Sequence, residues 1–103
     1  MDYRDLEGLD HPGLGLLAKE IREMIIKTVE SNGGHLASSL GAVELNIALL
    51  RSFDPSKDRI IFDVGHQAYA YKILTGRKDR IKTLRKWKGI SGFPDPKESP
   101  FDH

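Results

Sequence analysis

The sequence contains no cysteine, which excludes disulfide bonds and zinc sites built on thiolates. It also has no apolar run close to the roughly 20 residues that a membrane-spanning helix needs. The acidic beginning, Met-Asp-Tyr-Arg-Asp, differs from a secretory signal peptide. The Gly-x-Gly-x-x-Gly and Walker patterns of nucleotide-binding loops are absent as well. The lack of cysteine fits a reducing compartment, and we expect a cytoplasmic location.

The net charge of the chain is close to zero. The 103 residues carry a formal charge of +1, so the chain as a whole is not built to bind polyanions. The charge is nevertheless uneven, because the segment 77–88 contains seven basic residues and a single acid, Asp79. Such a run is typical of a solvated amphipathic helix. Binding of nucleic-acid phosphates through this run, with its one aromatic residue, Trp87, is the alternative.

Two apolar patterns predict helices in the first half of the chain. From Leu14 to Ser31 the apolar residues recur three and four positions apart and form one stripe, and Asn32-Gly33-Gly34 ends that helix. A second helix is predicted from about Leu40 to Phe53, with Ser38 or Ser39 as its N-cap. Because the second helix is apolar on most sides, we expect partners beyond this sequence to bury it.

The second half predicts an α/β fold. Arg59–Val64 is a short β-branched run, typical of a strand buried on both faces of a parallel sheet. A glycine turn follows at once, then a helix over Ala68–Leu74 that stops at Thr75-Gly76. A shorter helix over Asp79–Trp87 precedes the Gly- and Pro-rich loop 88–103. Because one strand cannot form a sheet, we expect a mainly parallel sheet that is incomplete in this chain.

The candidate site rests on two loops in which a histidine follows glycine and precedes a predicted helix. The first is the segment 33–41, Gly-Gly-His-Leu-Ala-Ser-Ser-Leu-Gly, with His35 and Ser38, and the second is Gly65-His66-Gln67. Helix N-termini offer free N–H groups to an anion, and the unperturbed pKa of histidine lies near neutrality. Two such loops can therefore converge at one anionic ligand. The alternative is that these residues only cap helices and satisfy local backbone groups. No metal site is predicted, because the histidine spacing fits none of the short zinc patterns.

Several motifs occur in order along the chain. They are Gly33–Gly41 with Val43-Glu44-Leu45, Asp63–Gln67, Tyr71–Arg77 with Asp79-Arg80, Gly89–Pro94, and Glu98-Ser99 with Phe101-Asp102. Together they resemble the start of the 1-deoxy-D-xylulose-5-phosphate synthase family, and the resemblance covers nearly the whole chain from about Leu14. Related transketolases share the histidine loops, but Gly-His-Gln and Ile-Leu-Thr-Gly-Arg favour the synthase.

The resemblance implies that residues 1–103 are part of a thiamine-diphosphate-binding domain, with an irregular lead-in over 1–13. In that family pyruvate loses carbon dioxide and its two-carbon unit joins glyceraldehyde 3-phosphate, which gives a precursor of isoprenoids, thiamine and pyridoxal. The implied cofactors are thiamine diphosphate and Mg²⁺, and the implied assembly is a homodimer. His66 matches the family histidine that contacts the cofactor. His35 matches an active-site histidine near the reactive carbon of the cofactor, and Ser38 is a weaker candidate for cofactor contact.

Later motifs of the family are absent from this sequence. They are a Gly-Asp-Gly motif for metal and diphosphate, a later Asn, and the Glu that activates the aminopyrimidine ring. We therefore expect the Mg²⁺ ligands to lie outside this chain, and the isolated chain to be inactive and to bind the cofactor weakly or not at all. Three alternatives stay open: another transketolase-like thiamine enzyme, a small basic nucleic-acid-binding module, and a non-catalytic remnant.

Overall fold

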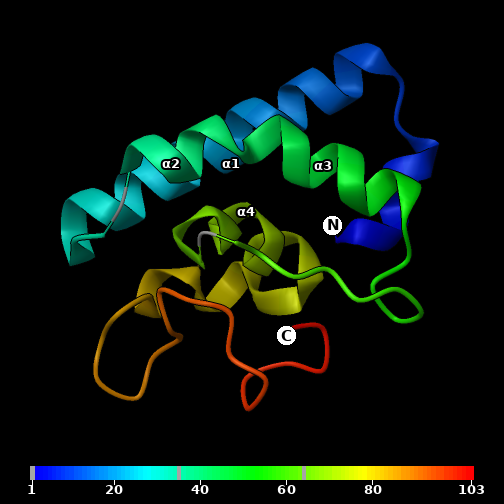
Figure 1. The fold of residues 1–103 in the computed structure, drawn as a ribbon. Coiled ribbons are helices and arrows are strands. Elements are labelled where there is room, and N and C mark those ends of the chain that lie inside the picture. The colour runs from blue at the N-terminus through cyan, green and yellow to red at the C-terminus, as the bar shows by residue number, and fades with distance from the viewer. Residues whose placement is uncertain (1, 35, 64) are drawn as a thin grey trace.

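The computed structural model describes residues 2–34, 36–63 and 65–103, apart from the side chain of His66. Short 3-10 or π-helical elements are labelled η. In chain order the elements are η1 (Tyr3–Gly8), α1 (His11–Asn32), α2 (Leu36–Gly41), α3 (Val43–Ser52), η2 (Gly65–Ala68), α4 (Tyr69–Lys72), η3 (Ile73–Arg77) and η4 (Lys78–Thr83). The chain reverses after α1, and α2 and then α3 pack alongside it in the opposite direction (Figure 1). Helix α4 packs beneath α1 and α3.

The core lies where the short helix α4 meets the two long helices. All four residues of α4 are buried, and Tyr69 and Tyr71 are at most 1% exposed. The apolar faces of α1 and α3, together with the turns after η4, supply further fully or almost fully buried side chains: Ile21, Ile25, Val43, Leu50, Leu84 and Ile90. Leu6 of η1 and Leu74 of η3 are buried as well. A four-residue helix gains little stability from its own hydrogen bonds, so tertiary packing must hold α4 in place.

Helix α1 confirms the first predicted helix. The carboxylate of Asp10 accepts a hydrogen bond of 2.8 Å from the backbone N–H of Gly13, which caps the helix start, and Pro12 stands in its first turn. At the other end Gly33 adopts a φ of 79°, and its N–H donates to the carbonyl of Val29. The segment expected as an irregular lead-in contributes η1 and the first turn of α1.

The second predicted helix is broken into two, and its predicted N-cap is wrong. Helix α2 begins at Leu36, so Ser38 and Ser39 lie inside it. The break falls at Ala42, whose φ of −104° and ψ of 3° interrupt the helix. The side-chain amide of Asn46 donates to the carbonyls of Ala42 and Gln67, which ties the break to η2. Apolar Leu36 therefore starts the helix earlier than the serine pattern predicts.

The predicted α/β fold with a mainly parallel sheet is wrong for this chain. No strand occurs in the described residues, and Arg59–Asp63 has no regular secondary structure. A strand needs a neighbouring strand to accept and donate its ladder hydrogen bonds, and the described part of the chain provides none. Ile60 and Phe62 still pack on the core, whereas Ile61 is 73% exposed. The apolar run thus packs two partly buried side chains on the core without forming a strand.

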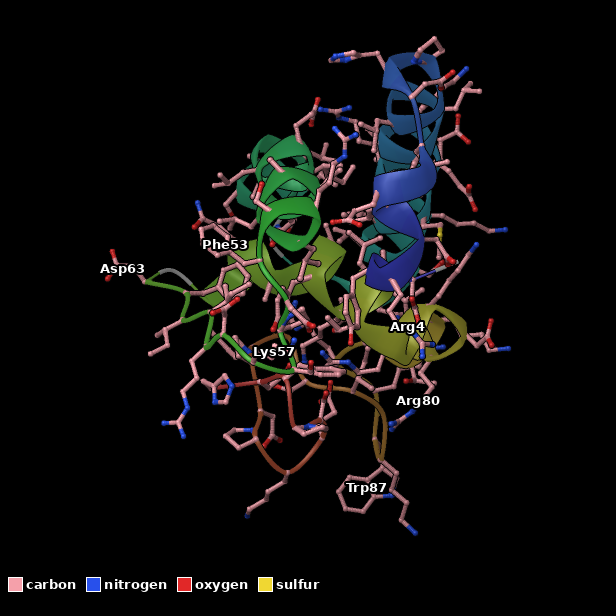
Figure 2. The ribbon with its side chains drawn as sticks, turned by 90° about the vertical axis from the view of Figure 1, so that its right-hand side faces the viewer. Arg4, Phe53, Lys57, Asp63, Arg80 and Trp87 are labelled. Atoms are coloured by element: carbon pink, nitrogen blue, oxygen red, sulfur yellow. The ribbon has the colours of Figure 1, made fainter. Side chains whose placement is uncertain are left out.

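The helix predicted over Ala68–Leu74 is confirmed as α4 with its flanking turns, and the predicted stop lies where Gly76 adopts a φ of 98°. The helix predicted over Asp79–Trp87 is shorter, because η4 ends at Thr83. Arg85 then takes a φ of 64°, which no right-handed helix allows. Trp87 is 90% exposed and points away from the body of the molecule (Figure 2).

Candidate functional site

Three glycine-containing segments meet around α4, and we call the meeting point of Gly34, Gly65, Tyr69, Gly92 and Phe93 the glycine junction. Tyr69 is fully buried. A Cβ atom added to Gly34 would lie 2.8 Å from its hydroxyl oxygen, and one added to Gly92 would lie 3.7 Å from the same atom. The phenol of Tyr69 therefore lies close against the backbone of two segments that are far apart in the sequence.

The third segment reaches the junction through Phe93. A Cβ atom added to Gly65 would lie 2.6 Å from Cδ1 of Phe93 and 3.3 Å from Cδ of Pro94. Contacts below about 3 Å are too close for real side-chain carbons, so any side chain at this position would displace the ring of Phe93. Gly65 directly precedes His66, and Gly34 directly precedes His35. The described neighbours of both predicted histidines thus pack into one region.

The structure locates the predicted site residues as follows. His35 lies outside the described residues. The backbone of His66 lies in η2, while its side chain is not among the described parts. Ser38 is half-buried on α2, and α2 packs against η2. Asp63, by contrast, is exposed and points outward (Figure 2). The convergence of the two histidine side chains stays a prediction.

A cavity of about 410 Å³ opens beside the glycine junction. Its cations are Arg85 and Lys86, and its carboxylates are Asp95 and Glu98. Glu98 is already neutralised by ion pairs with Lys72 and Arg77, so the lining has an excess of positive charge. The described lining therefore fits an anionic group such as a phosphate ester.

The position of Arg85 depends on the end of α1. The side-chain amide of Asn32 donates to the carbonyls of Lys82 at 2.8 Å and Leu84 at 2.9 Å. The N–H of Arg85 donates to the carbonyl of Ile90, also at 2.8 Å. Nη1 of Arg85 lies only 3.3 Å from where a Cβ atom of Gly33 would be. These bonds fix the backbone around Arg85, and its guanidinium lies next to the glycines that precede His35.

Behind the cavity lies a buried ionic cluster, which we define as Lys72, Arg77, Glu98 and Asp102. Each of these side chains is at most 7% exposed. Nζ of Lys72 lies 2.9 Å from Oε1 of Glu98, and Nη1 of Arg77 lies 2.7 Å from the same oxygen. Arg77 also forms two hydrogen bonds with Asp102. Two cations and two carboxylates make the cluster neutral.

Burial and hydrogen bonds oppose each other in this cluster. Burial lowers the pKa of Lys72, and the hydrogen bond to Glu98 only partly offsets that effect. Burial would raise the pKa of Glu98, but donors from Ser91, Lys72 and Arg77 outweigh it and lower that pKa below its usual range. Burial would also raise the pKa of Asp102, but donors from Arg77 and the N–H of Asp95 outweigh it in the same way. Burial likewise raises the pKa of Tyr71 to about 12. The two carboxylates of the cluster are therefore ionised near neutral pH.

Sequence reasoning missed both Tyr69 and the ionic cluster. Arg77 belongs by sequence to the basic run 77–88, but it is 4% exposed and paired. Lys78, the next residue of that run, pairs with Glu20 of α1. The one available signal was the position of Lys72 inside the apolar helix 68–74, where a charge needs a buried partner. These ion pairs remove two cations from the run on which the nucleic-acid alternative rests.

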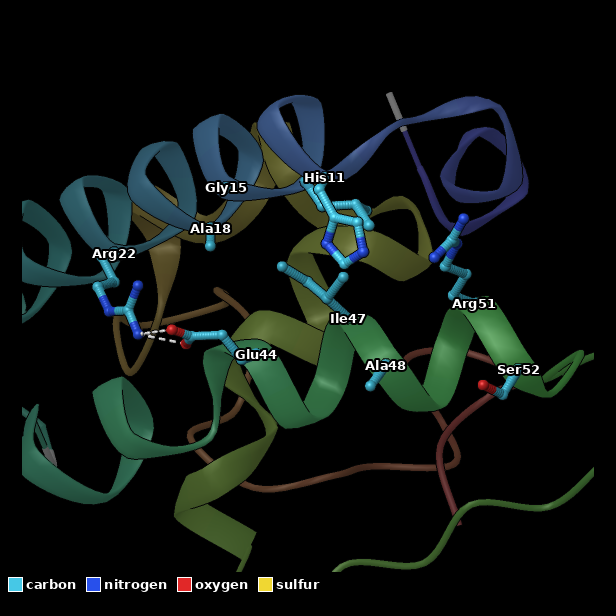
Figure 3. Close-up of a pocket in the computed structure, with 10 residues that line it drawn as sticks. His11, Gly15, Ala18, Arg22, Glu44, Ile47, Ala48, Arg51 and Ser52 are labelled. Carbon is cyan, nitrogen blue, oxygen red and sulfur yellow. Dashed lines mark hydrogen bonds and ion pairs between the residues drawn. The ribbon is translucent and has the colours of Figure 1, made fainter.

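A second cavity, of about 470 Å³, lies between α1 and α3 (Figure 3). The ion pair of Arg22 with Glu44 closes one end, Arg51 stands at the other, and Ala18 and Ile47 line its apolar side. Its described lining comes entirely from α1 and α3, so it lies apart from the glycine junction.

Metal clusters and membrane-spanning helices are both absent from the described residues. No group of three or more His, Asp or Glu side chains in these residues is placed to hold a metal ion. No helix formed by them is long and apolar enough to cross a membrane.

The family model described as 1-deoxy-D-xylulose-5-phosphate synthase matches residues 1–103, which is the whole chain. The chain belongs to the 1-deoxy-D-xylulose-5-phosphate synthase family. It is 61% identical over 99 residues to the synthase of Oleidesulfovibrio alaskensis, 64% over 98 residues to that of Thermus thermophilus, and 54% over 101 residues to that of Clostridium perfringens. These matches cover 96%, 95% and 98% of the chain, but only 16% of each relative.

Membership of the synthase family confirms the resemblance predicted from the ordered motifs. The chain corresponds to the N-terminal region of an enzyme family, and it spans about a sixth of the length of the relatives it matches. The segments that form the glycine junction, with Gly34, Gly65 and Gly92, are among the motifs that carried the resemblance.

Proposed function

We propose that the intact protein carrying this sequence is a 1-deoxy-D-xylulose-5-phosphate synthase, and that this chain supplies one side of its thiamine diphosphate site. In the proposed reaction the carboxylate carbon of pyruvate leaves as carbon dioxide, and the remaining two-carbon unit forms a carbon–carbon bond to the aldehyde carbon of glyceraldehyde 3-phosphate. The product serves the synthesis of isoprenoids, thiamine and pyridoxal. The match over residues 1–103 supports this proposal.

The glycine junction is the single observation that carries the proposed site. Gly34 and Gly65, the residues before the two histidines, pack against Tyr69 and Phe93, and Gly92 adjoins both contacts. A diphosphate is an anion, and the cationic excess of the neighbouring cavity suits it. Bound thiamine diphosphate would stabilise the negative charge left when carbon dioxide departs.

Within this site we assign separate roles to the three predicted residues. His66 contacts the cofactor and helps to hold it in position. Ser38, on the helix that packs against η2, is a second cofactor contact. His35 transfers a proton or contacts the substrate near the reacting carbon, a role that suits imidazole, whose unperturbed pKa lies near neutrality. The Mg²⁺ ligands belong to sequence outside this chain.

We further propose that the intact enzyme is a cytoplasmic homodimer and that the isolated chain has no activity. Apolar surface supports the need for further protein, since Leu45 is 58% exposed and Phe53 is 52% exposed on and after α3. Such side chains are candidates for burial against additional sequence or a second subunit.

An assay of the intact protein tests this function. With pyruvate, glyceraldehyde 3-phosphate, thiamine diphosphate and Mg²⁺, we expect equal amounts of carbon dioxide and 1-deoxy-D-xylulose 5-phosphate. Omission of thiamine diphosphate should abolish both, and the 103-residue chain alone should form neither. Formation of a different sugar phosphate would support another transketolase-like enzyme instead. No thiamine-dependent turnover by the intact protein with any aldehyde acceptor would refute the enzyme proposal.

A further inference from the structure

We propose that Lys72 and Glu98 are positioning residues that clamp Ser91 and thereby hold the segment 89–94 against the turn that carries His66. This inference rests on the proposed cofactor site and names two residues that act on it without touching the cofactor. It assigns a role to a buried ion pair that the reaction itself does not use.

The clamp grips both main-chain polar groups of one residue. Nζ of Lys72 donates to the carbonyl oxygen of Ser91 at 2.6 Å, and the N–H of Ser91 donates to Oε2 of Glu98 at 3.0 Å. Lys72 and Glu98 are joined to each other through Oε1 at 2.9 Å, so the three residues form a closed ring of hydrogen bonds. With the Lys72 side chain fully buried, water cannot replace these bonds.

The clamped residue is next to the glycine junction. Gly92 follows Ser91 and adjoins the hydroxyl of Tyr69, and Phe93 packs on Gly65. The hydroxyl of Ser91 also accepts the N–H of Phe93 at 3.1 Å. A shift of Ser91 therefore moves Phe93, and with it the backbone that directly precedes His66.

Stability alone is a poor explanation for this pair. A buried ion pair often contributes no more to folding than apolar side chains of similar volume, because both charges lose their hydration. What apolar side chains cannot do is hydrogen-bond the N–H and the C=O of Ser91 in one fixed arrangement. The ion pair is therefore suited to fixing the position of the Ser91 backbone.

Arg77 provides a matched comparison within the same cluster. It is as buried as Glu98 and pairs with the same Oε1 atom, but its hydrogen bonds reach Glu98, Asp102 and Thr75 rather than Ser91. Arg77→Met removes a buried positive charge and leaves both bonds to Ser91 in place. Lys72→Met removes a buried positive charge and breaks the clamp.

The test uses the intact synthase and two readouts other than turnover: the Kd of thiamine diphosphate by calorimetry, with Mg²⁺ present, and hydrogen exchange of the peptide that contains Ser91. We expect Lys72→Met to raise the Kd by about tenfold or more and to speed exchange at Ser91, because small displacements next to a binding group are costly. Arg77→Met should lower the Tm at least as much yet change the Kd less than about twofold. Lys72→Arg should restore part of the affinity, since it keeps a buried donor.

Two results would overturn the clamp. One is a Kd for Lys72→Met that equals that of Arg77→Met at comparable loss of Tm, and the other is unchanged exchange at Ser91. If Lys72→Met does not fold, Phe93→Ala replaces it, because Phe93 is 53% exposed and the substitution removes the ring that packs on Gly65. An unchanged Kd in that variant also overturns the inference. Failure of the wild-type protein to bind thiamine diphosphate would instead refute the proposed function.

Discussion

Arg77 and Asp102 meet in the interior through two parallel hydrogen bonds, Nη1 to Oδ2 and Nη2 to Oδ1, each 2.7 Å long. They are 25 residues apart in the sequence. The same carboxylate accepts the N–H of Asp95 at 2.9 Å. One bidentate pair therefore fastens the C-terminal loop to the turn that follows α4.

Removing the carboxylate of Asp102 should destabilise the fold strongly. In Asp102→Asn the guanidinium of Arg77 stays buried without its bidentate partner, so we expect a loss of about 3–5 kcal/mol in the free energy of unfolding. Urea denaturation of the 103-residue chain followed by circular dichroism measures this loss.

Glu20→Gln is the matched control for that substitution. Glu20 pairs with Lys78, but its side chain is 53% exposed and that of Lys78 is 40% exposed. The control should cost less than about 1 kcal/mol, because water screens an exposed pair. Equal losses in the two variants would contradict the account of the buried cluster.

The ionic cluster should also make stability depend on acid. The pKa of Glu98 and of Asp102 is lowered in the folded chain, while the same carboxyls in the unfolded chain take up protons near pH 4. At a pH between the folded and the unfolded pKa values, the unfolded chain binds more protons than the folded chain. Stability therefore rises with pH in this range, and it is lost as pH falls through the folded pKa values. We expect urea midpoints that are flat from about pH 7 to pH 5 and fall below about pH 5. The variant Glu98→Gln/Asp102→Asn should show a shallower fall, and an identical slope would argue against this origin.

Two glycines should respond to alanine with opposite signs. A Cβ atom on Gly89 would lie 1.9 Å from the carbonyl oxygen of Thr83, so Gly89→Ala must displace the backbone and should cost about 1–3 kcal/mol or more. Gly15 lies inside α1 with nothing within 4 Å of an added Cβ, so Gly15→Ala should stabilise by about 1 kcal/mol through helix propensity. Thermal unfolding of both variants measures the difference. A stabilising Gly89→Ala would show that the turn after η4 is wrongly placed.

Local periodicity was sufficient to predict the body and the end of α1, because its apolar stripe and its terminal glycines agree, but the helix begins three residues before the predicted Leu14, after the cap at Asp10. It failed at Arg59–Val64, where a β-branched run in the described part has no neighbouring strand to pair with. The serine pattern also failed to predict the helix start at Ser38. A serine caps a helix only if the residues before it are not helical, whereas Leu36, two residues earlier, already belongs to α2.

The candidate site was predicted only as far as local signals reach. Glycine followed by histidine is visible in the sequence, and this pattern alone points to His35 and His66. The contact of Gly34 with Tyr69, and that of Gly65 with Phe93, join segments about 30 residues apart, and no periodic pattern records such contacts. The position of Lys72 inside an apolar helix is visible in the sequence, but its pairing with Glu98 is not, because pairing of buried charges depends on the tertiary fold.

The most direct test of the central claim is a titration of thiamine diphosphate into the intact protein with Mg²⁺ present, comparing wild type with His66→Ala. His103→Ala serves as the matched control, because His103 is exposed. The account predicts that His66→Ala weakens cofactor binding by about tenfold or more while His103→Ala leaves it unchanged. Equal cofactor affinity in the wild type and His66→Ala would contradict the claim that this chain supplies one side of the cofactor site through His66.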